Sequence, residues 1–69
     1  MSQTYDFYSA RAAEAAAEAS NAKLENVRQR ALRSEATWQA LADQARSVAE
    51  QRKAIERQKA EERQAAAAD

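Results

Sequence analysis

Glycine and proline are both absent from this chain of 69 residues. They are the strongest local signals for turns and for breaks in regular structure, so a chain without them has few places where the backbone can reverse. Cysteine and histidine are absent too. The sequence therefore predicts an all-α fold made of a few long helices.

Large apolar side chains are too few to form a sufficient core within one copy. Apolar residues make up 45% of the chain, but most of them are alanine, whose burial removes little surface from water. Chains below about 70 to 80 residues usually need disulfides, a metal ion or oligomerisation. Without cysteine or histidine, disulfides and the common zinc sites are ruled out. We therefore expect a homo-oligomer, most simply a dimer, and no cofactor.

Charge and hydropathy do not point to nucleic acid or membrane as a partner. The chain has 11 basic and 11 acidic residues and a net charge of zero, so no overall field attracts it to a polyanion. Its start, Met1-Ser2-Gln3-Thr4, has neither the basic nor the apolar segment of a secretory signal. The longest apolar runs are short alanine blocks. We expect a cytoplasmic protein that does not enter membranes.

Two heptad patterns run along the chain in different phases. The first consists of Tyr5, Tyr8, Ala12, Ala15, Ala19 and Ala22. The second has Leu24, Ala31, Trp38 and Ala45 at position a and Val27, Ser34, Leu41, Val48 and Ile55 at position d. The phase changes at Ser20 and Asn21, whose side chains can cap a helix. We therefore predict a helix over about 5–20, a turn at about 20–23 and a second helix from about 24, forming an antiparallel hairpin over 1–50.

Folding back places small residues of the first helix against the second. Ala16 and Ala19 then face Leu24 and Val27, and the alanines let the helices approach closely. The tyrosines of the first helix come level with Trp38 and close the open end of the hairpin. The predicted hairpin core consists of Tyr5, Tyr8, Ala12, Ala16, Ala19, Leu24, Val27 and Ala31.

A single continuous rod is the alternative fold. A stutter of four residues through Ala16 and Ser20 to Leu24 would carry one apolar stripe past the change of phase. The hairpin is favoured because it gives the aromatic residues of the first segment a partner on the second.

The second pattern continues beyond the reach of the first helix, so it needs a partner outside the hairpin. A second copy of the chain is the simplest partner. An antiparallel register sets Trp38 opposite Val48 and Leu41 opposite Ala45, whereas a parallel register stacks Arg52 on its own copy. We expect a coiled-coil-like homo-oligomeric bundle, antiparallel in order. Its predicted interface consists of Trp38, Leu41, Ala45, Val48 and Ile55.

Residues 51–69 form a polar, charged extension of the second helix. Ion pairs at i, i+4 should support it, among them Arg52 with Glu56 and Arg57 with Glu61. The alanine-rich end at 65–69 should fray. Because the extension contains only one large apolar residue, Ile55, it suits another helical protein better than a membrane surface.

The basic start of the second helix is the one candidate for an anion or partner contact. Lys23, Arg28, Arg30 and Arg33 could contact phosphates or an acidic protein. Glu25 and Glu35 dilute this charge, and no aromatic residue lies among these positions to stack on bases. Nucleic-acid binding is therefore only the alternative function.

No arrangement in the sequence suggests catalysis. The chain lacks the histidine and cysteine of common general bases and nucleophiles, and the glycine of phosphate-binding loops. Glu14 and Glu18 lie one turn apart but have no histidine to complete a carboxylate metal site. Trp38 is explained more simply by packing than by ligand stacking, while Phe7 and Leu32 lie off the two stripes and suggest a second contact surface.

Three segments of the chain are similar to those of known proteins. They are Arg11-Ala12-Ala13-Glu14-Ala15, Leu24-Glu25-Asn26-Val27-Arg28-Gln29-Arg30-Ala31-Leu32-Arg33-Ser34-Glu35, and Trp38-Gln39-Ala40-Leu41-Ala42. Together they make the chain, from about Tyr5 to Ala45, resemble a group of short uncharacterised bacterial proteins, mostly alphaproteobacterial. The resemblance implies a bacterial cytoplasmic protein and brings no activity, cofactor or catalytic residue. It makes Asn26, Arg28, Arg30 and Trp38 the first positions to mutate.

These observations together lead to one expected function. We expect a non-catalytic structural or adaptor protein that works through helix–helix interaction and self-association, with a nucleic-acid accessory protein as the alternative.

Overall fold

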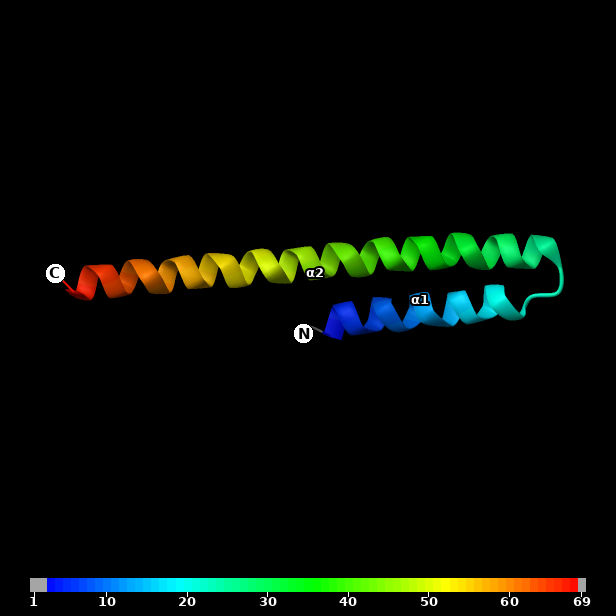
Figure 1. Ribbon diagram of the computed structural model, residues 1–69, viewed down its shortest axis with the longest axis horizontal. Coiled ribbons are helices and arrows are strands. Elements are labelled where there is room, and N and C mark those ends of the chain that lie inside the picture. Colours follow the sequence, from blue (N-terminus) through cyan, green and yellow to red (C-terminus); the bar gives the residue numbers. More distant parts are fainter. Residues whose placement is uncertain (1–2, 69) are drawn as a thin grey trace.

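The computed structural model describes residues 3–68 and contains two helices in that range. Helix α1 spans Gln3–Asn21 and helix α2 spans Glu25–Ala68. The helices lie side by side and run in opposite directions (Figure 1). The predicted all-α antiparallel hairpin is therefore confirmed, and the single continuous rod is wrong. Expectations for Met1, Ser2 and Asp69 lie outside the described residues.

The connection between the helices consists of residues 22–24, against the turn predicted at about 20–23. The amide of Ala22 donates to the carbonyl of Ala19 at 3.4 Å, and the amide of Arg28 donates to the carbonyl of Leu24 at 3.0 Å. Among the described residues none has a positive φ. The chain thus reverses direction without the backbone conformation for which glycine is usually needed.

Alanine forms the core between the helices. The buried apolar residues are Ala12, Ala15 and Ala19 of α1 and Ala31 and Ala42 of α2. Small side chains allow the two helix axes to approach closely. They remove little apolar surface from water, so the hairpin gains less from burial than a leucine-rich pair of helices would.

The face that α2 turns toward α1 differs from the predicted one. It combines a positions with e positions: Ala31 and Ala42 are buried, and Glu35, Trp38, Ala45 and Ala49 are partly buried. Of the d positions level with α1, Val27 and Leu41 are partly buried and Ser34 is exposed. Val48 and Ile55, 39% and 51% exposed, lie where α1 begins or beyond it. The physical reason is size, because Ala42 at position e lets α1 lie closer to the helix than the leucine beside it at position d.

The prediction that Leu24 belongs to the hairpin core is wrong. Its side chain is 64% exposed. Leu24 precedes the first residue of α2 and lies in the connection, so the helical spacing that would direct it toward α1 does not apply to it. The other predicted core residues, from Tyr5 to Ala31, are buried or partly buried.

Helix α2 is much longer than α1 and projects beyond it (Figure 1). At about 1.5 Å per residue, α1 is about 28 Å long and α2 about 66 Å. We call residues 50–68 the arm; all of them except the partly buried Ala60 are exposed. The alanines at 65–68, which the sequence predicts to fray, are helical, in keeping with the high helix propensity of alanine. The molecule is a rod of 68 × 14 × 12 Å.

Candidate helix-binding face

One side of α2 carries no charged residue over a long stretch. At about 100° per residue, ten residues between positions 37 and 58 share a sector of about 140°: Thr37, Ala40, Leu41, Gln44, Ser47, Val48, Gln51, Ala54, Ile55 and Gln58. We call this set the uncharged face. The seven charged residues of the same segment all lie on the remaining sides: Asp43, Arg46, Glu50, Arg52, Lys53, Glu56 and Arg57.

A row of large apolar side chains runs along the uncharged face. Leu41, Val48 and Ile55 are seven residues apart and therefore lie on one line along the helix. Leu41 is partly buried, whereas Val48 and Ile55 are exposed within a single copy. Water-exposed rows of this kind are typical of surfaces that bind another helix.

Helix α2 and the first turns of α1 form a groove along one edge of this face. Its volume is about 380 Å³, and it is lined by Thr4, Tyr8, Leu41, Gln44, Ala45, Val48, Ala49 and Arg52. The groove lies where α1 begins and α2 continues alone. It therefore offers a partner a wall from α1 as well as the apolar row of α2.

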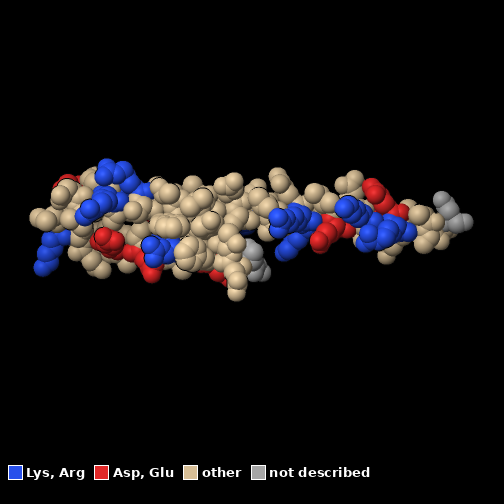
Figure 2. Space-filling view, turned by 180° about the vertical axis from the view of Figure 1, so that it is seen from behind, with Lys and Arg blue, Asp and Glu red and all other residues tan. Residues whose placement is uncertain are grey.

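Charged side chains gather at the two ends of the molecule. On the side seen in Figure 2, acidic and basic groups cluster near the connection and along the arm, with an uncharged stretch between them. On the arm the two signs are mixed, and Glu50 at its start lies 3.9 Å from Arg46, one turn earlier in α2, as an i, i+4 pair. The arm is thus a solvated, mixed-charge surface on its outer sides.

An aromatic cluster fixes the start of α1 against α2. The Trp38 ring centroid lies 5.9 Å from that of Tyr8 and 5.9 Å from that of Phe7, the latter edge-on at 87°. The guanidinium carbon of Arg11 lies 5.2 Å from the Trp38 ring centroid, within reach of a cation–π interaction. Trp38 therefore packs within its own chain, with Tyr8 level with it as expected.

The sequence did not place Phe7 and Arg11 in this cluster. Phe7 lies off the first apolar stripe and is 56% exposed, yet its ring contacts both Tyr8 and Trp38. The available signal was spacing, since Arg11 follows Phe7 by four residues and Tyr8 by three and so lies next to both on the helix surface. The second contact surface expected from Phe7 and Leu32 stays a prediction, since both side chains remain exposed.

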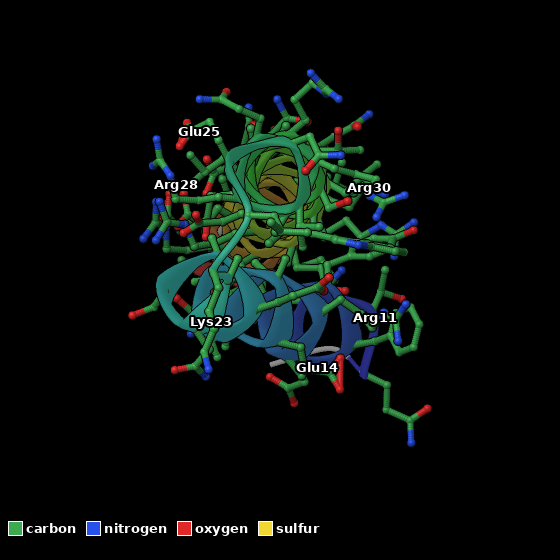
Figure 3. The ribbon with its side chains drawn as sticks, turned by 90° about the vertical axis from the view of Figure 1, so that its right-hand side faces the viewer. Arg11, Glu14, Lys23, Glu25, Arg28 and Arg30 are labelled. Carbon is green, nitrogen blue, oxygen red and sulfur yellow. The ribbon has the colours of Figure 1, made fainter. Side chains whose placement is uncertain are left out.

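The predicted basic group is not gathered on one face. Arg28 and Arg30 lie on opposite sides of α2, and Lys23 lies at the connection (Figure 3). Arg28 also donates to both carboxylate oxygens of Glu25, at 3.1 and 2.6 Å. This contact lowers the pKa of Glu25, with a further contribution from Gln29, and raises the pKa of Arg28. Arg28 is thus engaged locally, and the four predicted basic residues do not form a single anion site.

The glutamates of α1 lie beside a second groove. This groove has a volume of about 310 Å³ and is lined by Arg11, Glu14, Ala15, Glu18, Ser34 and Trp38. Glu14 pairs with Arg11 at 3.5 Å, and both side chains are exposed. Within residues 3–68 no three histidine, cysteine or carboxylate groups could jointly hold a metal ion. Glu14 and Glu18 are surface carboxylates.

Comparison with known proteins adds no relative. No family model, curated protein or solved structure matches this chain. Neither described helix has an apolar stretch long enough to cross a bilayer. The resemblance to short bacterial proteins therefore stays a prediction.

Proposed function

We propose that this protein is a non-catalytic structural or adaptor protein of the cytoplasm that acts by helix–helix association, including self-association. Its contact surface is the uncharged face of α2. The observation that carries the proposal is the row of Leu41, Val48 and Ile55 on a charge-free side of a chain that is 32% charged. Leu41 is only partly buried, and Val48 and Ile55 are exposed.

The shape of the molecule supports this proposal. Helix α1 accounts for less than half the length of α2, so the arm has no tertiary support within one copy. A helix without such support depends on propensity and on i, i+4 pairs, which contribute only about 0.2–0.5 kcal/mol each. Burial of apolar side chains contributes about 25 cal/mol per Å². A second helix on the uncharged face would therefore stabilise α2 substantially.

Sedimentation equilibrium over a concentration series tests the proposal. We expect the wild type to associate and Val48→Asp to sediment as a monomer, because the aspartate places a charge in the middle of the apolar row. Leu32→Asp is the matched control: Leu32 is 37% exposed, close to the 39% of Val48, and lies on another side of α2. We expect Leu32→Asp to associate like the wild type.

Two results would contradict the proposal. One is a wild-type chain that stays monomeric and fully helical at every concentration. The other is equal loss of association in Val48→Asp and Leu32→Asp, which would mean that the contact does not depend on the uncharged face.

A further inference from the structure

We infer that the helix bound by the uncharged face is α2 of a second copy, lying antiparallel with the twofold axis near Arg46. The inference rests on the proposed function and names the occupant of its contact surface. It follows from which side of α2 is free, from the charges at the two ends of that side, and from the position of the groove.

The hairpin itself decides which side of α2 is free. Helix α1 covers positions a and e, as the burial of Ala31 and Ala42 shows, and Trp38 packs on Phe7 and Tyr8 of its own chain. The antiparallel register expected from the sequence pairs Trp38 with Val48 of a second copy. That register uses the side of α2 on which Trp38 already packs against α1. Of the positions that α1 leaves free, b and f carry most of the charged residues, whereas c, d and g make up the uncharged face.

The uncharged face ends in opposite charges. Arg30 and Arg33 precede Thr37 and Ala40 by seven residues and so lie on the same lines of the helix. At the other end, Glu61 and Glu62 follow Ala54 and Ile55 by seven residues. The face is therefore an uncharged stretch with a basic pair at its start and an acidic pair at its end.

Antiparallel pairing brings each basic end to an acidic end. A single register sets Arg30 opposite Glu62 of the second copy. Arg33 then lies level with Lys59 and two residues from Glu61, so Arg30 and Glu62 form the one directly opposed pair of opposite charges in this register. The same register sets Leu41 opposite Gln51 and Gln44 opposite Val48, so uncharged residues meet throughout the middle. Parallel pairing would instead stack arginine on arginine and glutamate on glutamate, and like charges at flanking positions select against an arrangement.

The same register places the twofold axis at the middle of α2. The axis falls near Arg46, and the midpoint of α2, which spans Glu25–Ala68, lies at the same level. The two copies of α2 therefore overlap over their whole length, and the arm of each lies along the hairpin of the other. The groove, whose α2 residues run from Leu41 to Arg52, is centred on this axis.

Disulfide trapping tests order and register directly, because the chain has no native cysteine. Ser47→Cys lies beside the axis and should form a disulfide dimer with itself on mild oxidation. Gln58→Cys alone should stay monomeric on a non-reducing gel, since its copy would lie about 36 Å away along the helix. An equal mixture of Ser34→Cys and Gln58→Cys should give the mixed disulfide, identified by mass spectrometry of the linked peptides.

Each other outcome overturns the inference. Self-linked Gln58→Cys would show a parallel pair. Failure of Ser47→Cys to link, with association by sedimentation still dependent on Val48, would show another order or register and leave the proposed function standing. A wild type that sediments as a monomer at every concentration would exclude a second copy as the occupant and contradict the proposed self-association as well.

Discussion

At the scale of single residues, local pairs determine where the charged and aromatic side chains lie. Arg11 is engaged by the Trp38 ring and by Glu14, and Arg28 is held by Glu25. Neither arginine is therefore free to join a shared anion site. The sequence predicts the basic segment from residue type alone, whereas partners three or four positions away decide the direction of each side chain.

The Glu25–Arg28 pair makes a prediction about pH. Hydrogen bonds from Arg28 first, and then from Gln29, hold the pKa of Glu25 below its usual value. Because the folded pKa lies below the unfolded one, the pair stabilises the fold above the unfolded pKa of the glutamate, and this contribution is lost as pH falls through the lowered pKa. We expect Arg28→Gln to raise the pKa of Glu25, measured by NMR titration of its carboxyl carbon.

Arg30→Gln is the control for this titration. Arg30 lies on the opposite side of α2 from Arg28 (Figure 3), so its replacement should leave the Glu25 titration unchanged. An unaltered pKa of Glu25 in Arg28→Gln would mean that the pair does not form in solution.

At the scale of the helices, the alanine core explains what the sequence could and could not predict. The absence of glycine and proline and the change of heptad phase near Ser20 were enough for two antiparallel helices. The rotation of α2 from an a/d face to an a/e face was not predictable from hydropathy. A hydropathy pattern favours Leu41 over Ala42, but close approach of the helices favours the smaller side chain. The uncharged face was therefore only partly predicted, through Leu41, Val48 and Ile55.

Ala42 tests this account of the core. It is 0% exposed, so Ala42→Leu inserts a large side chain between two closely packed helices. We expect a loss of about 1–3 kcal/mol in the free energy of unfolding, the usual cost of overpacking, measured by urea denaturation at fixed protein concentration. Ala36→Leu, at an exposed alanine of α2, should change it little. Stabilisation by Ala42→Leu would show that the helices are not in close contact there.

At the scale of the whole molecule, the length difference between the helices is the central fact. A rod of 68 Å with its second helix covered over less than half its length leaves the uncharged face open on both sides of the groove. In the antiparallel pair, each arm covers the face that the other hairpin leaves open. A partner chain of a different sequence would need the same arrangement of a charge-free middle and oppositely charged ends, and the chain itself already provides it.

Charge reversal at the ends of the face tests this complementarity. When Glu61 and Glu62 are replaced by lysine, the arm of one copy gains two cations. These lie near Arg30 and Arg33 on the hairpin of the other copy. Exposed ion pairs contribute about 0.2–1 kcal/mol each, and twofold symmetry gives two Arg30–Glu62 pairs. Because repulsion between like charges adds to their loss, we expect the dissociation constant measured by sedimentation to rise by about twofold to thirtyfold. The change should shrink in high salt, because exposed charges are screened.

The matching reversal at the other end should restore association. When Arg30 and Arg33 are also replaced by glutamate, opposite charges again meet in the antiparallel pair, and the dissociation constant should return toward that of the wild type. In a parallel pair the first reversal would only exchange one set of like charges for another, so neither variant would differ much from the wild type. A loss that the second reversal fails to repair would point to weakening of the arm helix itself, where Glu61 follows Arg57 by four residues. Rescue thus requires contact between the hairpin of one copy and the arm of the other.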